Sequence, residues 1–271
     1  MTLIANRINT LLLVLVVLMA GAIITMLATR AYGGPLDPPG PPAATDGVRG
    51  PGTPISSLPF TITGPGYYYV TRTLNGPTGS GGIIIDASDV TLDLGGFTLF
   101  AGLFPLNGID AGSGPNIVIR NGAVRGWVNG IVGDQIRVDH VEASNNTNGF
   151  SIGADSEVND CKASRNGQTG ITADHTVVRR CTISGNGNNG VVATGNSLIE
   201  DNRVSGPSGA GIVVNGNNNT IRDNELSGNT LDVQILAGRT GSVIAGNAYC
   251  SLTDSGTNTI LSGNFVRIPA C

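Results

Sequence analysis

Short apolar bursts recur at regular spacing through most of the chain. From Ile83 to Cys271, runs of two to four apolar residues alternate with Gly, Asn, Asp and Ser. Runs of this length are too short for an α-helix and suit short β-strands joined by turns. The unit repeats about every 20 to 23 residues, which is the signature of a stacked repeat protein.

One register aligns each apolar burst with a small residue three positions later. Its pairs are Val118 with Asn121, Val138 with Val141, Val158 with Cys161, Val178 with Cys181, Ile199 with Asn202, and Ile221 with Asn224, before looser rungs ending at Asn247 and Asn264. Another column holds Asn146, Asn166, Asn186, Pro207 and Asn229. A unit of this size cannot bury its apolar face alone, so copies must stack. The pattern therefore predicts an all-β, single-stranded parallel β-helix of about eight rungs.

Charged residues support this register. Strands in successive rungs lie about 4.8 Å apart, so residues one repeat apart should pair with opposite charge. The predicted columns are Arg179, Glu200, Arg222; Asp160, Arg180, Asp201, Asp223; Glu142, Lys162; and Arg203, Glu225. Six neighbouring pairs are opposite in sign, and only Asp201 over Asp223 is alike.

The composition excludes two broad classes. The chain has 41 Gly and only 13% charged residues, yet its mean hydropathy is +0.13, which argues against disorder. The net charge is −4 without a basic block, so nucleic acid is not an expected partner.

The N-terminal region reads as an export segment. Arg7 precedes an uncharged apolar stretch, Leu11–Ala28, which favours either a cleaved signal peptide or a retained signal anchor within residues 1–31. Residues 32–54 form a Pro- and Gly-rich spacer, residues 55–82 an N-terminal β cap with three tyrosines, and residues 83–271 the β-helix. We expect an extracellular or cell-surface protein that meets a membrane only through residues 11–28.

Four cysteines in an exported chain favour disulfides. Cys250 and Cys271 are expected to tie the C-terminal end to the last rung. Cys161 and Cys181 fall in adjacent rungs, so either a bridge or a stacked pair of buried thiols fits their spacing.

Two stretches then point to a known family. "ASDVTLDLGGFTL" (Ala87–Leu99), followed by Gly-Ile rungs with Asn turns, resembles secreted bacterial right-handed parallel β-helix repeat proteins of the pectin-lyase-like superfamily. "GPLDPPGPP" and "ISSLPFTITGPGYYYVTRTL" resemble their leader and cap. The resemblance implies that the β-helix is right-handed. It leaves the activity open, because this fold hosts lyases, hydrolases, epimerases and adhesins. Gly95 departs from the pattern, which usually has Asn there.

Candidate chemistry is sparse. Asp134, Asp155 and Asp174 follow the Gly-Ile strands of successive rungs and could together hold Ca²⁺, although Asp also suits turns. His140 is expected between Arg120 and Asp160, and His175 in a turn; both are interpreted as surface residues. Paired Asp with Gly-His-Gly, typical of polygalacturonases, is absent.

Aromatic residues for sugar binding are also few. Trp127 and Phe150 lie near the start of successive Gly-Ile strands and are the candidates for a small exposed patch, with core burial as the alternative. The sequence favours a non-catalytic β-helix scaffold or adhesion module that contacts extracellular polysaccharide or a cell-surface component. The alternatives are a Ca²⁺-dependent, pectate-lyase-like enzyme and a self-assembling surface or filament protein.

Overall fold

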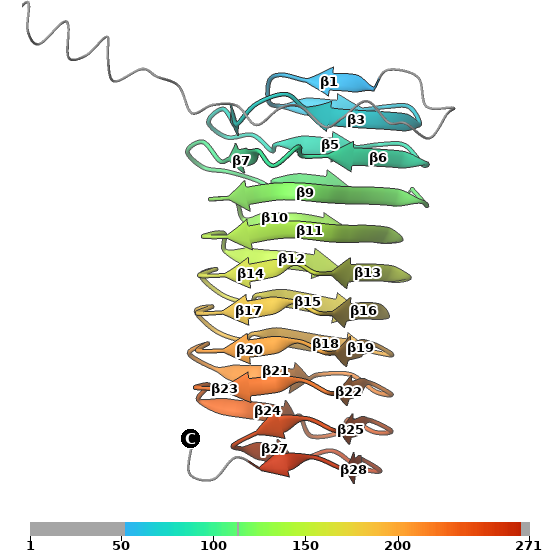
Figure 1. The fold of residues 1–271 in the computed structure, drawn as a ribbon, viewed down its shortest axis with the longest axis vertical. Helices are drawn as coiled ribbons and strands as arrows, with labels where there is room; N and C mark the ends of the chain where they lie inside the picture. Colours follow the sequence, from blue (N-terminus) through green and yellow to red (C-terminus); the bar gives the residue numbers. More distant parts are fainter. Residues whose placement is uncertain (1–51, 113, 267–271) are drawn as a thin grey trace, which may run out of the picture. The chain divides into compact units, whose positions relative to one another are not determined.

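The computed structural model describes residues 52–112 and 114–266, and these form a stack of β-strand turns (Figure 1). Every described regular element is a β-strand, and all strand pairs within this part of the chain are parallel. No helix among the described residues is long and apolar enough to cross a membrane. The prediction of an all-β parallel solenoid is confirmed.

Each turn contributes strands to two sheets. The ten-stranded sheet contains β2 (Phe60–Ile62), β5 (Ile83–Ile85), β8 (Ile109–Ala111), β10 (Asn129–Gly133), β12 (Asn148–Ile152), β15 (Ile171–Asp174), β18 (Val191–Gly195), β21 (Ala210–Val214), β24 (Leu231–Ile235) and β27 (Leu252–Asp254). These ten strands mark about ten turns, two more than the sequence predicted.

The 19-stranded sheet has two halves separated by a corner in most turns. The first half contains β1 (Thr53–Ile55), β3 (Gly66–Val70), β6 (Val90–Asp93), β13 (Ser156–Asn159), β16 (Thr176–Arg179), β19 (Leu198–Glu200), β22 (Thr220–Arg222), β25 (Val243–Ala245) and β28 (Ile260–Ser262). The second half contains β4 (Leu74–Asn75), β7 (Thr98–Phe100), β14 (Lys162–Ser164), β17 (Thr182–Ser184), β20 (Arg203–Ser205), β23 (Glu225–Ser227), β26 (Ala248–Tyr249) and β29 (Phe265–Val266). The long strands β9 (Ile117–Arg125) and β11 (Ile136–Ser144) run through both halves.

The additional turns lie at the N-terminal end. The segment expected to form a separate cap pairs directly with the next turn: β2 with β5, β3 with β6, and β4 with β7, all in parallel. Residues 53–75 therefore already follow the path of the β-helix, because their apolar residues alternate at the same inward positions.

The register was predicted correctly from Val138 onward. Val138, Val158 and Val178 pair in successive turns and continue into the Ile199, Ile221, Ile244 column. Upstream the predicted register was wrong by one residue, since Val138 pairs with Ile119 and not with Val118. The cause is strand alternation: Ile117 and Ile119 are buried, so Val118 between them must point outward.

The corners repeat one local device. A residue with positive φ turns the chain, and from Asp160 onward the residue after it is an inward Cys or Asn. One such column is His140, Asp160, Arg180, Asp201, Asp223, Gly246 and Gly263. Asn, Asp and Gly are the residues that tolerate this left-handed conformation best, which explains much of the chain's turn composition.

Buried asparagines then stack along the axis. The side-chain oxygens of Asn202, Asn224 and Asn247 each accept from a backbone nitrogen of the preceding turn, at 2.9, 3.0 and 3.0 Å. The predicted column Asn146, Asn166, Asn186 does the same at 2.9 to 3.1 Å. These ladders satisfy corner amides that would otherwise be buried without partners.

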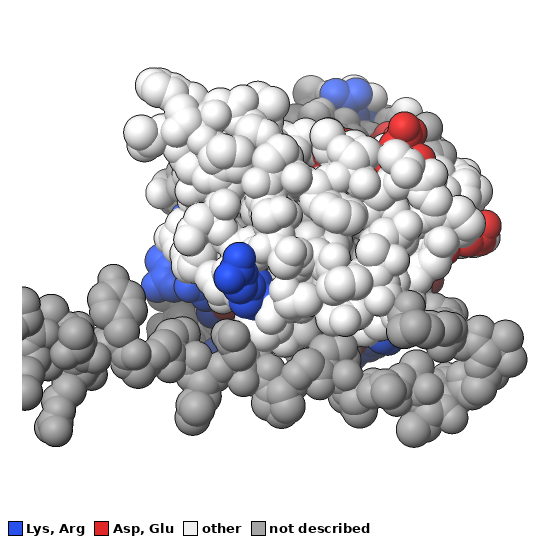
Figure 2. All heavy atoms as spheres, turned by 90° about the horizontal axis from the view of Figure 1, so that it is seen from above, with Lys and Arg blue, Asp and Glu red and all other residues white. Residues whose placement is uncertain are grey.

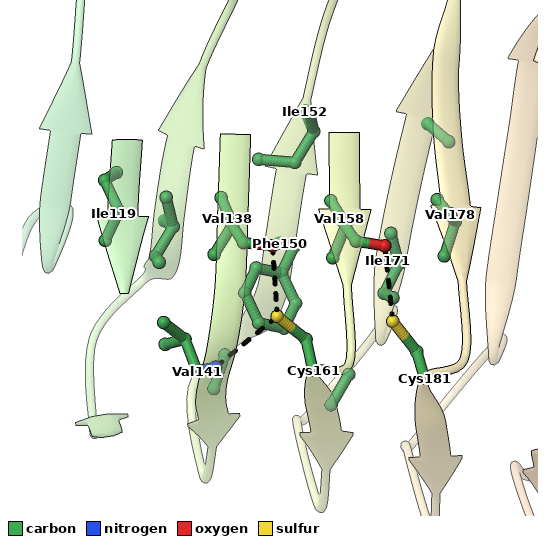
Figure 3. Close-up of a cluster of buried hydrophobic side chains, with 14 of the residues drawn as sticks. Ile119, Val138, Val141, Phe150, Ile152, Val158, Cys161, Ile171, Val178 and Cys181 are labelled. Carbon is green, nitrogen blue, oxygen red and sulfur yellow. Dashed lines mark hydrogen bonds between the residues drawn. The ribbon is translucent and has the colours of Figure 1, made fainter. Parts of the chain in front are cut away.

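Cys161 and Cys181 continue the first of these ladders on the N-terminal side. Both are buried free thiols, and Figure 3 shows them side by side in successive turns, beneath Val158 and Val178. Cys161 accepts from the Val141 amide at 3.4 Å, and the Cys181 thiol lies 3.5 Å from the Val158 carbonyl oxygen. The stacked pair of thiols is therefore the alternative that the structure contains. Cys271 lies outside the described residues, so its pairing with Cys250 stays a prediction.

Candidate functional site

A strip of alternating charges runs along the outward face of the first half of the 19-stranded sheet. Its main row is formed by residues that pair in successive turns: Asp93, Arg120, Asp139, Asn159, Arg179, Glu200 and Arg222. Beside it, two positions earlier in each strand, lies a second row that includes Val118, Arg137, Glu157, Val177 and Leu198. We call the four arginines and their acidic partners in these rows the arginine strip.

Each arginine of the strip is held by a carboxylate. Arg120 lies 2.9 Å from Asp93, and Arg137 lies 2.7 Å from Asp139. Farther along the axis, Arg179 binds Glu157 at 3.3 Å, and the Arg222 Nε donates to Glu200 at 2.9 Å.

Asparagine side chains link these pairs into a longer network. The Asn159 amide donates to Asp139 at 3.2 Å and to Glu157 at 3.1 Å, while its oxygen accepts from Arg179 at 2.8 Å. The middle of the strip is therefore one continuous hydrogen-bonded surface rather than a set of separate pairs.

Three of the four arginines of the strip are more exposed than the carboxylates that bind them. The side chains of Arg120, Arg137 and Arg222 are 43%, 55% and 49% exposed, whereas those of Asp93, Asp139 and Glu200 are 3%, 16% and 13% exposed. The fourth pair, Arg179 with Glu157, is the exception, because both side chains are partly exposed. In the other three pairs the carboxylate is therefore much less exposed than the guanidinium group, and a guanidinium carries five N–H donors. A rigid row of guanidinium donors suits carboxylate or sulfate groups of a ligand.

A shallow hollow of about 470 Å³ adjoins the strip. It lies between the outward row and the neighbouring corner, so it has one wall of charged side chains and one of turn residues. Its lining consists of Pro115, Asn116, Ile117, Val118, Gln135, Ile136, Arg137, Asp155 and Glu157.

At its N-terminal end the strip meets aromatic residues. Tyr67 and Tyr69 on β3 stack at 6.0 Å between ring centroids, and the Arg120 guanidinium lies 6.0 Å from the Tyr67 ring centroid. Burial, and next the charge of Asp93, raise the pKa of Tyr67. The Tyr67 hydroxyl therefore stays protonated and faces Asp93, with 3.5 Å between their oxygens.

The described carboxylates with shifted pKa values favour the ionised form. Hydrogen bonding from Arg180 lowers the pKa of Asp160. Burial acts to raise the pKa of Glu142, but Ser144 and the charges of Arg125 and Lys162 outweigh it and hold the pKa below its usual range. A general acid needs the opposite shift. These two groups are therefore suited to ion pairing rather than to proton donation.

The predicted exposed aromatic patch is wrong. Trp127 is 1% exposed and Phe150 is fully buried. The Trp127 indole nitrogen donates to the Leu99 carbonyl at 3.1 Å, and Phe150 occupies the inward column between Ile131 and Ile171. Both side chains fill the core, so neither can meet a sugar.

The three candidate calcium ligands do not form one column. The turn from Gly133 to Ile152 is 19 residues, so Asp134 stacks on Gly153 and not on Asp155. Asp155 instead belongs to the corner column of Gln135 and His175, each with a positive φ. Calcium binding therefore stays a prediction whose three ligands this structure does not bring together.

The histidines lie at two different corners. Asp139 pairs with Arg120, so the next residue, His140, stacks on Asn121. Its expected position above Arg120 was therefore wrong by one residue. His175 lies 3.0 Å from Asp174 through Nδ1 and 2.9 Å from the Asn196 amide through Nε2, and its side chain is half exposed. The interpretation of His175 as a surface turn residue agrees with this geometry.

Sequence reasoning missed most of the arginine strip. Arg179, Glu200 and Arg222 were recognised as a column, but Arg120 and Asp139 were not joined to it, because the upstream register was shifted by one residue. The alternation in "IVIR" (Ile117–Arg120) held the missing signal, since two inward isoleucines place Arg120 outward.

The fold and the comparisons define the class: this is a right-handed parallel β-helix of the pectin-lyase-like type. Residues 88–264 match the family model described as "Periplasmic copper-binding protein (NosD)". The chain belongs to that family. No curated protein sequence matches the chain.

Several solved structures share the fold at low sequence identity. The Dettilon tailspike protein (gp208) matches with a TM-score of 0.62 and 14% identity, over 78% of this chain and 51% of the tailspike. A double mutant of the periplasmic alginate epimerase AlgG matches with a TM-score of 0.58 and 15% identity, over 77% of this chain and 71% of the epimerase. The catalytic domain of a GH87 α-1,3-glucanase matches with a TM-score of 0.52 and 11% identity, over 78% of this chain and 52% of the glucanase chain.

The described residues do not fit a copper centre. Copper sites use thiolate, thioether and imidazole ligands. Within 52–112 and 114–266, no three His, Cys, Asp or Glu side chains gather closely enough to hold a metal ion. Burial strongly raises the pKa of the Cys161 thiol, so it stays protonated and is a poor ligand at neutral pH.

Proposed function

We propose that this protein is an exported, non-catalytic β-helix scaffold or adhesion module that binds acidic extracellular polysaccharide along the arginine strip. The single observation that carries the proposal is the exposure difference along the strip: outward arginines above largely buried carboxylates. This arrangement presents cationic donors on a chain whose net charge is −4.

The rigidity of the strip supports binding over a long ligand. Successive turns lie about 4.8 Å apart, so the donors form a straight row along the axis. Because carboxylates and Asn159 fix the guanidinium groups in place, little side-chain entropy is lost when a polymer binds. The neighbouring hollow gives room for the ring of a sugar beside the row.

The known relatives are consistent with this role. The family is described as periplasmic, and the structural neighbours include an alginate epimerase and a glucanase. Together with the apolar N-terminal stretch, these descriptions support export from the cytoplasm.

Binding is tested with the purified full chain and a polyuronate, using calorimetry at low and high salt. Arg137→Ala should weaken binding by about tenfold, which corresponds to about 1.4 kcal/mol, because it removes one charge-assisted contact. Arg203→Ala, at an exposed arginine in the second half of the sheet, is the matched control and should leave the affinity unchanged. Equal loss in both variants, or no binding to any acidic polymer, would exclude the strip as the site.

A polysaccharide-active enzyme is the second candidate, favoured by the chemistry of the neighbouring epimerase and glucanase. A lyase would produce new double bonds, which absorb in the ultraviolet, and a calcium-dependent one would lose activity in chelator. Turnover of the bound polymer under these conditions would replace the non-catalytic proposal, whereas binding without products supports it.

A further inference from the structure

One corner of the N-terminal turns carries an apolar ledge. The connection from β7 to β8 spans eight residues, from Ala101 to Gly108, whereas the equivalent connection after β9 spans three. The longer connection projects Leu103, Phe104 and Leu106, whose exposed fractions are 71%, 81% and 58%.

The ledge is ordered by its neighbours in the stack. The Gly79 amide donates to the Leu103 carbonyl at 2.7 Å, the Leu106 amide donates to Ser80 at 3.2 Å, and the Val128 amide donates to Leu106 at 2.9 Å. The loop is therefore held on both sides by main-chain hydrogen bonds, and its apolar side chains are presented in a fixed arrangement.

Adjacent turns extend the apolar surface. Ile84 and Val128 are 44% and 40% exposed, and with Leu106, Gly81, Asn107 and Asp110 they line a hollow of about 240 Å³. Phe100, which ends β7 just before this loop, is 38% exposed. The remaining large apolar residues exposed among the described ones lie at the opposite end of the stack, in the last two strands: Ile260, Leu261, Phe265 and Val266. A contiguous exposed apolar patch on a soluble body marks an interaction surface.

The patch carries little charge. No charged residue occurs from Gly95 to Ile109, and the one charged residue that lines the hollow, Asp110, accepts from the Asn107 side-chain amide at 3.0 Å. Viewed from the end of the stack that carries β1, the visible described atoms are mostly those of uncharged residues, with scattered basic and acidic groups (Figure 2). Exposed Phe and Leu with few charges around them are suited to the boundary between lipid headgroups and acyl chains.

We propose that this ledge, Leu103, Phe104 and Leu106 with Ile84 and Val128, contacts the surface of the membrane in which residues 11–28 are retained as an anchor. The chain enters the stack at β1, and the ledge belongs to the third turn counted from β1, so both lie at the same end. The 24 residues from Thr29 to Gly52 can extend at most roughly 80 Å. A tether of that length keeps the ledge at high local concentration near the bilayer, so weak apolar contacts suffice.

The full chain, reconstituted into phosphatidylcholine vesicles, tests this directly. Leu103→Trp adds a fluorophore at the ledge, and wild type supplies the background of the buried Trp127. The Leu103→Trp emission should shift to the blue and be lost when brominated phosphatidylcholine replaces the ordinary lipid. Phe265→Trp, in the last described strand at the opposite end, should keep its emission and remain open to iodide in water.

Two results overturn the proposal. Leu103→Trp could respond to iodide and ignore brominated lipid, just as Phe265→Trp is expected to do. It could also be shielded from iodide without vesicles, which would mean that a second copy or residues 1–51 cover the ledge. If Leu103→Trp fails to fold by circular dichroism, Leu106→Trp is measured in the same way.

Discussion

Replacing Gly170 by alanine should lower the free energy of unfolding by about 3 kcal/mol or more. A Cβ at Gly170 would lie 2.7 Å from the Asn186 side-chain nitrogen, 2.7 Å from the Gly190 carbonyl oxygen and 2.9 Å from an Ile183 methyl group. Asn186 belongs to a buried asparagine ladder, and the Gly190 carbonyl belongs to the backbone of the next turn. The added methyl group must therefore displace both. Thermal unfolding followed by circular dichroism should show a fall of about 10 °C in melting temperature.

Gly167→Ala is the matched control in the same turn. A Cβ there would find its nearest atoms at 3.8 to 3.9 Å, which is ordinary van der Waals contact. We expect its stability to stay within about 0.5 kcal/mol of wild type. If both variants lose stability equally, Gly170 is needed for backbone freedom in general and not for close packing between turns.

The second large effect is expected at Asn224, in the middle of a buried ladder. Its side-chain oxygen accepts from the Asn202 backbone and side-chain nitrogens, both at 3.0 Å, and its amide donates to Ile199 at 2.8 Å and Asn247 at 2.9 Å. Asn224→Ala removes all four bonds and leaves buried polar groups without partners, each costing about 1–3 kcal/mol. We expect a loss of about 3 kcal/mol or more in denaturant unfolding.

Asn188→Ala provides the comparison, because Asn188 is exposed and its side chain lies at the surface of a corner. Its stability should be nearly unchanged. Since solenoids unfold turn by turn as well as globally, hydrogen exchange should locate the Asn224→Ala damage in the turns of Asn202, Asn224 and Asn247. Damage spread evenly over the stack would contradict a local ladder.

The repeated polar corners made much of the fold predictable. From Val138 onward the columns of Asn, Cys and alternating charge lie where the sequence placed them, because each inward amide needs an equivalent partner one turn away. Upstream of Cys161 the corner positions that hold Cys and Asn in later turns are occupied by Val141 and Gly122. Neither residue gives a polar signal, so only the alternation of apolar residues could decide the register there.

The buried aromatic residues show a different limit. Phe150 follows Gly149 as the isoleucines follow their glycines, so its inward position was visible in the repeat. The inward position of Trp127 was not visible in the repeat. Its indole fits into the core only because two residues of earlier turns are glycines: a Cβ at Gly76 or Gly108 would lie 2.5 or 2.9 Å from the indole. The exposure of the arginines over the carboxylates depends on side-chain packing, which a repeat pattern does not contain.

Engineered disulfides on the outward row test the stacking on which the arginine strip depends. Leu198 pairs with Thr220, and Thr220 with Val243, in the row that continues from Arg137. Cα atoms one turn apart, at about 4.8 Å, are within disulfide range, and those two turns apart, at roughly 9.6 Å, are not. Peptide mapping of the oxidised full chain should find the cross-link in Leu198→Cys with Thr220→Cys and none in Leu198→Cys with Val243→Cys. A cross-link only in the second variant would contradict the register and, with it, the continuous strip.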